Sequence, residues 1–310
     1  MRGTRLLAIV AAVALAGGCT TLASSAAGSG AAGSGPFDRA SSDRAWVKTS
    51  FIALPVTAGG KTWTTAGELR EPLIDPAEAR ARPAVVIVHG SGGVDSRGGA
   101  YAEALNRAGF VTLEIDLWAA RGVASPADRP KAVAETLPDA FAALAFLSTR
   151  PGVDAGRVGI MGFSWGGVVS MLSASRAANQ THGRPGLAFA AHAPLYPVCW
   201  VYNRVPGYEF ADLTGAPVLL QAGAGDLYDD PDSCEKLGAS LPEPARSTVT
   251  VITYAGATHA WDRREPDITA NDPFSHKGAG GEVPFHYDAS VTRRSTEAVV
   301  AFFGRVLGRP

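Results

Sequence analysis

The sequence predicts an α/β protein in which a mostly parallel central sheet carries helices on both faces. From residue 46 onward, short apolar runs that suit strands alternate with longer segments of helical periodicity. This alternation is typical of strands joined by helical crossovers, which build a parallel sheet. Several of the apolar runs are continuous, as expected of strands buried on both faces. Apolar residues make up 46% of the 310 residues, which is enough for a large core.

The N-terminal segment is predicted to be a targeting signal. Arg2 and Arg5 precede an almost unbroken apolar run over residues 6–16, which is too short for a stable membrane span. Residues 1–18 therefore predict a signal peptide and an exported protein. Cys19 follows two glycines and resembles the lipidated cysteine of bacterial lipoproteins, which would anchor the protein to a membrane, facing the periplasm or the cell exterior. An ordinary secretory signal, giving a secreted or periplasmic protein, is the alternative.

Residues 19–45 are expected to form a flexible tether behind that cysteine. The segment contains Gly-Ser-Gly twice and cannot bury enough apolar surface to fold. Residues 46–310 then form one domain, because the pattern shows neither an internal repeat nor a second domain.

The domain is expected to open with two antiparallel strands. They lie at Trp46–Leu54 and Lys61–Arg70, on either side of a turn at Gly59-Gly60. Ala84–Val88 follows as a continuous apolar run between a proline and a glycine, and it predicts a strand buried on both faces.

The rest of the chain alternates helix and strand. The first expected helix ends at a glycine, the second carries a proline near its start, where proline is tolerated, and the last is amphipathic. The expected helices are Tyr101–Ala108, Ala132–Thr149, Trp165–Ala178 and Ala289–Leu307. The expected strands are Phe110–Ile115, Arg157–Phe163, Leu187–Ala193, Pro217–Gly223 and Thr248–Tyr254.

A nucleophile motif lies where such a sheet forms its sites. Loops at the carboxyl ends of parallel strands gather at one edge of the sheet. Residues 162–166 read Gly-Phe-Ser-Trp-Gly and fit G-x-S-x-G between a predicted strand and a predicted helix. The tight turn requires glycine at 162 and 166, and it presents the hydroxyl of Ser164 at the positive end of the following helix. A chance glycine-rich turn is the alternative, and the flanking elements argue against it.

A serine hydroxyl needs a base, and the base needs an orienting acid. In this architecture the acid precedes the histidine in the chain. Asp226 follows a buried strand, and His259 lies in a small-residue loop after the next strand. We therefore expect His259 to take the proton of Ser164 and Asp226 to orient the imidazole. Competing acids in the same loop are interpreted as a solvated stretch; they are Asp229, Asp230 and Asp232.

An oxyanion formed in acyl transfer needs preorganised N–H donors. The backbone N–H of Trp165 is one candidate, because it opens the helix after the serine. Residues 89–93 read His-Gly-Ser-Gly-Gly, and Ser91 is expected to supply the second donor, with Gly92 close behind. His89 is expected to be a structural hydrogen-bonding residue. A phosphate-cradling loop is the rival interpretation, but no Gly-Lys-Ser/Thr follows.

Other residues near the strand ends are candidates for a substrate pocket. Trp118, Arg121 and Trp261 are the substrate-binding candidates, with core packing or structural pairing as the alternative. The stretch Arg263–Phe285 is rich in Pro, Gly and Asp, and it is either a lid over the site or a surface excursion.

Composition excludes several classes of protein. The 28 Lys and Arg nearly balance the 29 Asp and Glu, which argues against nucleic acid as the main partner. Three cysteines are too few for a disulfide scaffold or a four-thiolate zinc site, and no metal or organic cofactor is expected. Cys199 and Cys234 can pair in an oxidising compartment, but spacing alone leaves this open.

An ordered set of motifs over residues 66–307 resembles the dienelactone hydrolase family of α/β-hydrolases. The resemblance implies the α/β-hydrolase fold and ester hydrolysis. Enzymes that give the family its name use a cysteine nucleophile, whereas this chain has Ser164, so the ring-opening of dienelactones is not implied. The matching stretches are AVVIVHGSGG (84–93), GFVTLEIDLW (109–118) with Arg121-Gly122, the turn at Ser164, Gly225-Asp226, YAGATHAW (254–261) and AVVAFF (298–303).

Together these residues predict an exported serine hydrolase that cleaves a small ester through an acyl-enzyme. A peptidase or amidase of the same fold is the nearer alternative, because leaving-group preference cannot be read from the sequence. A noncatalytic binding lipoprotein is the more distant one, and the intact serine, aspartate and histidine weigh against it.

Overall fold

The computed structural model describes residues 46–73, 80–125 and 128–308 of the chain. The predicted signal peptide (1–18) and the predicted tether with Cys19 (19–45) lie outside these residues. Within the described ranges, no helix combines the length and the apolar composition that a membrane crossing requires.

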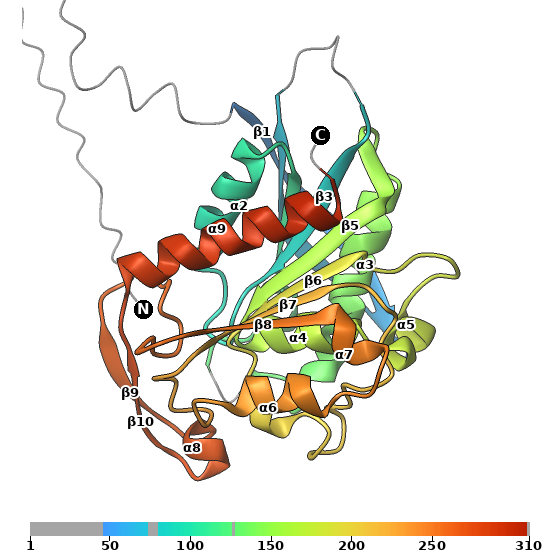
Figure 1. Ribbon diagram of the computed structural model, residues 1–310. Helices are drawn as coiled ribbons and strands as arrows, with labels where there is room; N and C mark the ends of the chain where they lie inside the picture. Colours follow the sequence, from blue (N-terminus) through green and yellow to red (C-terminus); the bar gives the residue numbers. More distant parts are fainter. Residues whose placement is uncertain (1–45, 74–79, 126–127, 309–310) are drawn as a thin grey trace, which may run out of the picture. The chain divides into compact units, whose positions relative to one another are not determined.

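Eight strands form one sheet, in the order β1-β2-β4-β3-β5-β6-β7-β8. They span Val47–Ala58 (β1), Lys61–Pro72 (β2), Arg82–Val88 (β3), Val111–Asp116 (β4), Val153–Phe163 (β5), Ala191–Leu195 (β6), Val218–Gly223 (β7) and Val249–Tyr254 (β8). The six strands from β3 to β8 run parallel, whereas β1 pairs antiparallel with β2 and β2 with β4 (Figure 1). The mostly parallel sheet and its antiparallel opening pair are thus confirmed.

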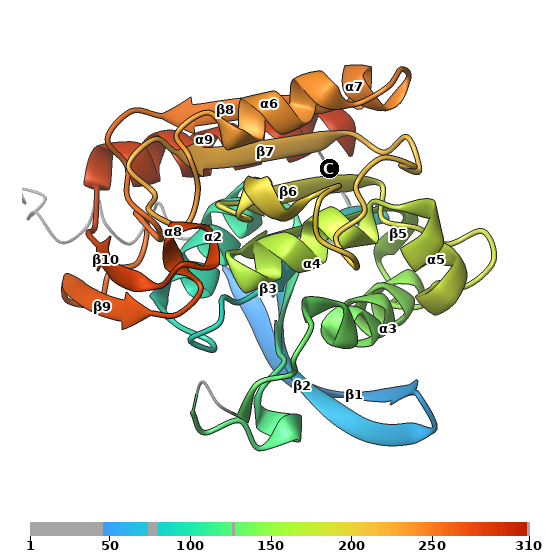
Figure 2. The same cartoon turned by 90° about the horizontal axis from the view of Figure 1, so that it is seen from below.

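Helices cover both faces of this sheet. They span Ser96–Arg107 (α2), Leu137–Ser148 (α3), Trp165–Ser173 (α4), Arg176–His182 (α5), Ser233–Ser240 (α6), Ala245–Thr248 (α7) and Ala289–Val306 (α9). In Figure 1, α4 and α6 lie on one side of the sheet and α2 and α9 on the other, and Figure 2 turns the same helices by 90°. Side chains of α3, α4 and α6 join one buried core, and those of α2 and α9 join the other. In β3, Val86 and Val88 belong to the first core, and Val85 and Ile87 to the second. This alternation is why β3 reads as a continuous apolar run.

Several of the expected elements have different limits. The helix expected over 165–178 is two helices, because the hydroxyl of Ser175 accepts the N–H of Ala178 at 3.1 Å and begins α5 there. The strand expected over 187–193 begins at Ala191, after a turn.

Two helices also start elsewhere than expected. The helix expected over 101–108 begins at Ser96, because the carboxylate of Asp95 accepts the N–H of Arg97 at 3.1 Å and caps it. The helix expected over 132–149 opens with a 3-10 turn before α3 begins at Leu137.

The stretch after His259 builds a small hairpin outside the main sheet. β9 (Ile268–Asp272) pairs antiparallel with β10 (Gly281–Phe285), and the short turn α8 (Ser275–Gly278) lies between them. The N–H of Asp288 donates to the carbonyl of Trp261 at 2.8 Å and closes the base of the excursion. Figures 1 and 2 show the hairpin beside the ends of β7 and β8.

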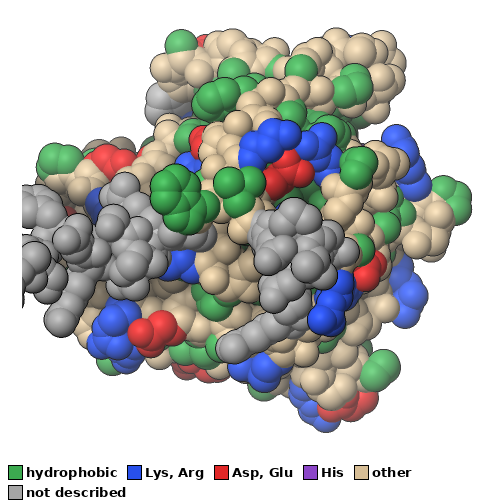
Figure 3. All heavy atoms as spheres, turned by 90° about the horizontal axis from the view of Figure 1, so that it is seen from above, with side chains coloured by type: hydrophobic (Ala, Val, Ile, Leu, Met, Phe, Trp, Pro, Cys, Tyr) green, Lys and Arg blue, Asp and Glu red, His purple; other side chains and the backbone are tan. Residues whose placement is uncertain are grey.

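Charged side chains of both signs share the face seen in Figure 3. Acidic side chains stand next to basic ones there, and hydrophobic side chains are scattered among them. The described part of this face therefore carries no uniform basic surface, in agreement with the balanced composition.

Candidate active site

Ser164 occupies the tight turn between β5 and α4. Its φ of 50° and ψ of −108° lie outside the regions that L-residues usually adopt. A Cβ on Gly162 would lie 2.3 Å from the backbone of Gly166, and a Cβ on Gly166 would lie 2.1 Å from the carbonyl oxygen of Val88. Only glycine fits at these two positions, and the close packing around them sustains the strained backbone of Ser164.

Three side chains from separate loops meet at this turn. The hydroxyl of Ser164 lies 2.9 Å from Nε2 of His259, and Nδ1 of His259 lies 2.7 Å from Oδ2 of Asp226. The histidine and the aspartate are buried, whereas the serine is more open. With the carboxylate accepting the Nδ1 proton, Nε2 is the acceptor for the proton of the serine hydroxyl. This arrangement can convert the hydroxyl into a nucleophile.

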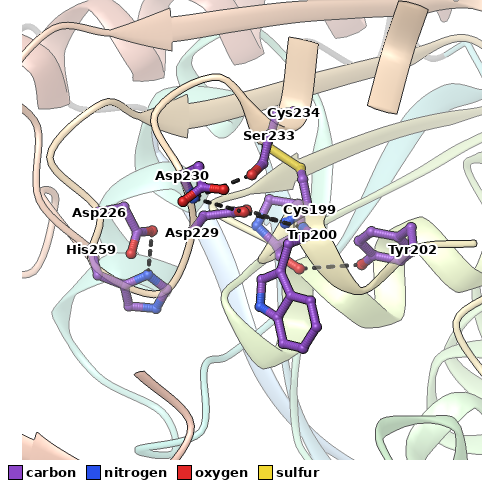
Figure 4. The surroundings of a disulfide bond; sticks show 10 residues. Cys199, Trp200, Tyr202, Asp226, Asp229, Asp230, Ser233, Cys234 and His259 are labelled. Atoms are coloured by element: carbon purple, nitrogen blue, oxygen red, sulfur yellow. Dashed lines mark hydrogen bonds and ion pairs between the residues drawn. A yellow bond between two sulfur atoms is a disulfide. The ribbon is translucent and has the colours of Figure 1, made fainter. Parts of the chain in front are cut away.

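The competing acids have other partners. Asp229 accepts the backbone N–H of Cys199 and, at 3.2 Å, that of Trp200, and burial raises the pKa of Asp229 to about 6. Figure 4 shows Asp226, and not Asp229, directed at His259. The other two acids each pair with a lysine at 2.8 Å, in the pairs Asp230–Lys277 and Asp232–Lys236.

A disulfide joins Cys199, in the short turn η5 (Cys199–Val201), to Cys234 in α6. Their Cα atoms are 5.0 Å apart, and the bond links the loop after β6 to the helix that follows the loop of Asp226 (Figure 4). Among the described residues, the two sulfurs and a carboxylate of Asp229 are the group close enough to share an ion. Because the sulfurs are bonded to each other, this group offers no pair of thiolates to a metal.

Three aromatic side chains enclose the imidazole of His259. Its ring centroid lies 4.4 Å from that of Tyr228, 4.9 Å from that of Tyr196 and 5.8 Å from that of Phe285. The hydroxyl of Tyr228 donates to Asp272 at 2.8 Å, and burial together with this bond holds the pKa of Tyr228 above its usual value. These aromatic residues were not among the predicted site residues. Only Tyr228 could have been predicted to lie near the histidine, because it follows Asp226 by two residues.

Tyr196 is held in turn by a buried polar network. Its backbone φ is 38°, and its hydroxyl donates to Asp262 at 2.6 Å and accepts from Arg97 at 3.2 Å. Arg97 also forms a short ion pair with Asp95, and burial raises the pKa of Asp262. The network therefore fixes the ring that packs against His259, although no hydrophobic periodicity signals it.

The loop after β3 packs directly against the nucleophile turn. The N–H of Gly93 donates to the carbonyl of Gly90 at 3.1 Å, and the carbonyl of Ser91 accepts the indole N–H of Trp118 at 3.1 Å. On the other side, Trp165 is the first residue of α4, and N–H groups of a first helical turn have no acceptor within the helix. The two expected oxyanion donors thus belong to adjacent segments.

His89 has both ring nitrogens engaged. Nδ1 donates to the carbonyl of Gly90 at 2.7 Å, and Nε2 accepts the N–H of Leu117 at 2.9 Å. This pair of bonds fits the neutral imidazole, and it ties the loop after β3 to the end of β4. The contacts agree with the structural role expected for His89.

Two of the three pocket candidates are corrected. Trp261 has 0% of its surface exposed and packs edge-on against Tyr196 at 4.7 Å, so it cannot touch a bound molecule. The guanidinium of Arg121 is engaged by the buried carboxylate of Asp139 at 2.6 and 3.0 Å, and it lies over the ring of Trp63. Its role in the fold is therefore to hold the loop after β4 to α3.

Trp118 remains next to the site. Its ring packs edge-on against that of Trp165 at 5.3 Å and against His89 at 5.1 Å. It is mostly buried, and its indole N–H orients the loop that contains Ser91.

Comparisons with known proteins agree with this architecture. Residues 70–307 match the dienelactone hydrolase family. The chain is 27% identical over 226 residues to a curated relative from Methylorubrum extorquens named "Putative carboxymethylenebutenolidase", which covers 63% of this chain and 72% of the relative.

Two solved structures are similar in fold at low identity. Thermogutta terrifontis esterase 2 phosphorylated by paraoxon has a TM-score of 0.56 and 16% identity, covering 86% of this chain and 95% of its own. A hyperthermophilic esterase from the archaeon Pyrobaculum calidifontis has a TM-score of 0.57 and 17% identity. The match covers 83% of this chain and 85% of the esterase. With its mostly parallel sheet, its strand-to-helix turn at Ser164 and a match across most of its length, the chain belongs to the dienelactone hydrolase family and has the α/β-hydrolase fold.

Proposed function

We propose that this protein is an exported serine esterase that hydrolyses small carboxylic esters. Membership of the dienelactone hydrolase family makes it a hydrolase related to esterases. The observation that supports the serine mechanism is the continuous row of hydrogen bonds from Ser164 through His259 to Asp226, at 2.9 and 2.7 Å. These three side chains supply the nucleophile, the base and the orienting acid that acyl transfer requires.

The reaction proceeds through an acyl-enzyme. His259 accepts the hydroxyl proton as Oγ of Ser164 attacks the ester carbonyl carbon, and Asp226 stabilises the resulting imidazolium. The backbone N–H groups of Trp165 and Ser91 receive the negative oxygen. The imidazolium then protonates the leaving alcohol. A water molecule, deprotonated by the same imidazole, attacks the acyl-enzyme and releases the acid.

The acyl group is proposed to lie beside Trp118. This ring packs against the ring of Trp165, and its indole N–H donates to the carbonyl of Ser91, so it contacts both residues whose N–H groups are proposed to receive the oxyanion. A carbonyl held by these donors brings its acyl substituent next to an apolar surface, which favours acyl groups without charge.

Covalent labelling tests the enzyme assignment. A fluorophosphonate probe is expected to modify wild-type protein at Ser164, to leave Ser164→Ala unlabelled and to label His259→Ala at a greatly reduced rate. Labelling mapped by peptide mass spectrometry is the measurement. Folded wild-type protein that takes up no probe would favour the noncatalytic alternative.

Export and lipid attachment form a separate part of the proposal. The basic start, the apolar run and Cys19 support a signal peptide followed by a lipidated cysteine. Stable anchoring takes more than one acyl chain. A Cys19→Ala variant is expected in the soluble fraction while the wild type sediments with membranes. Unchanged partitioning of the variant would end the lipoprotein proposal without affecting the esterase.

A further inference from the structure

One face of the β9–β10 hairpin is turned toward the catalytic histidine. The strands pair with Ile268 opposite Phe285, and with Ala270 opposite Val283. Residues directly opposite in an antiparallel pair share one face, so these four apolar side chains lie on the same side of the hairpin. Phe285 packs edge-on against the imidazole of His259, with centroids 5.8 Å apart, which identifies that side as the one facing the site.

The hairpin is fixed in this position by polar contacts at several points. The hydroxyl of Tyr228 donates to Asp272 of β9 at 2.8 Å, and the N–H of His276 donates to the carbonyl of Leu227 at 2.7 Å. Near the end of β10, the N–H of His286 donates to the hydroxyl of Thr258 at 3.1 Å. The hairpin is thus tied to the residues that precede His259 and follow Asp226.

The inward face becomes more exposed toward the start of β9. Val283 is buried, Phe285 is half-buried, and Ile268 is 46% exposed. The opposite face of the hairpin carries polar side chains, among them Thr269, Asn271 and Glu282. An accessible isoleucine therefore stands on the side of the catalytic histidine, where a bound molecule can cover it.

Acyl transfer determines which part of an ester reaches this face. The leaving oxygen must take its proton from Nε2 of His259, so the alcohol portion lies on the histidine side of Ser164. The acyl portion lies on the side of the oxyanion donors. Residues that pack against the imidazole therefore border the alcohol and not the acyl group.

We infer that Ile268 and Phe285, together the hairpin strip, bind the alcohol portion of an ester substrate and select apolar alcohols. This inference rests on the esterase function proposed above and names the part of the substrate that the hairpin recognises. The two residues lie opposite each other in the hairpin, and Phe285 packs against the imidazole.

Isomeric esters test the inference, because they differ in which side carries the carbon chain. Hexyl acetate and ethyl hexanoate have the same composition, and both can be compared with ethyl acetate by pH-stat titration on full-length protein. Ile268→Ser is expected to lower the ratio of kcat/KM for hexyl acetate to that for ethyl acetate by about fivefold. The reason is that the hexyl chain has four more methylenes than the ethyl chain, and the variant removes the apolar contact on one side of them. The corresponding ratio for ethyl hexanoate is expected to stay within twofold of the wild-type value.

Thr269→Ser is the matched control, since it removes one methyl from the neighbouring position on the opposite face. It is expected to leave both ratios unchanged, and Phe285→Leu is expected to reduce the hexyl acetate ratio as Ile268→Ser does. An equal or larger loss on ethyl hexanoate, or the same loss in Thr269→Ser, would overturn the assignment of the strip. If folded wild-type protein hydrolyses none of the esters, the proposed function fails and this inference fails with it.

Discussion

Replacing Glu114 by glutamine is expected to stabilise the protein at alkaline pH. Glu114 lies in β4 beneath α2, and it is so close to the helix that a Cβ on Gly98 would lie 1.8 Å from its Oε1. The side chain is 7% exposed, and Oε1 has no hydrogen-bond partner. Burial raises the pKa of Glu114 to about 7, against the attraction of Arg70. The folded protein therefore holds a carboxyl that prefers to be neutral.

The sign and the size follow from the two pKa values. The native state binds the proton more tightly than the unfolded state, where the usual pKa of Glu is 4.5. The stabilising contribution is fully present below pH 4.5 and is lost as the pH rises through about 7. The difference corresponds to about 3 kcal/mol of unfolding free energy between pH 4.5 and pH 8. Glutamine stays neutral at every pH, so the variant lacks this pH-dependent loss of unfolding free energy.

Urea unfolding at pH 5 and pH 8 measures the effect. Glu114→Gln is expected to gain about 3 kcal/mol relative to the wild type at pH 8 and much less at pH 5. Glu103→Gln, on the exposed side of α2 and paired with Arg107, is the control, with nearly equal effects at both pH values. If the curves of free energy against pH for the wild type and Glu114→Gln run parallel, the reasoning from burial is refuted.

Three other predictions concern the site and its surroundings. Asp226→Asn is expected to lower kcat by roughly a thousandfold or more, since the amide cannot hold the imidazole in the required tautomer; a loss below tenfold in ester turnover would contradict its role. Gly166→Ala is expected to give no folded protein, because its Cβ would lie 2.1 Å from a β3 carbonyl oxygen, whereas Gly92→Ala has open space and is expected to keep the wild-type Tm. Changing Cys199 and Cys234 together to serine is expected to cost about 4 kcal/mol of unfolding free energy by release of a loop with a separation of 35 residues, and chemical unfolding with an unchanged midpoint would contradict this.

The three catalytic candidates could be predicted from the sequence because each of them follows a predicted strand. Ser164, Asp226 and His259 each follow an apolar run, and the carboxyl ends of parallel strands converge on one edge whatever the intervening chain does. The three residues could therefore be expected together without knowledge of any contact. In the structure, the hydroxyl of Ser164 lies 2.9 Å from Nε2 of His259, and Nδ1 of His259 lies 2.7 Å from Asp226.

The substrate-binding candidates could not be judged in this way, because the roles of their side chains depend on partners elsewhere in the chain. Arg121 is engaged by Asp139, and Trp261 is covered by Tyr196, whose own backbone has a φ of 38°. No local pattern marks either pairing. The hairpin is similarly hard to predict, since its strands span only five residues each and β10 contains Pro284.

The hydrogen bond between the N–H of Asp288 and the carbonyl of Trp261 has a consequence for how relatives of this protein can diverge. The bond, at 2.8 Å, brings the two ends of the excursion together, so the chain between them leaves the domain and rejoins it at the same place. The part of this segment between β9 and β10 can therefore change in length or sequence while the histidine before the hydrogen bond and the helix after it keep their places. Within a lineage, new substrate preferences can thus arise by mutations in this one segment, while the adjacent catalytic residues stay unchanged.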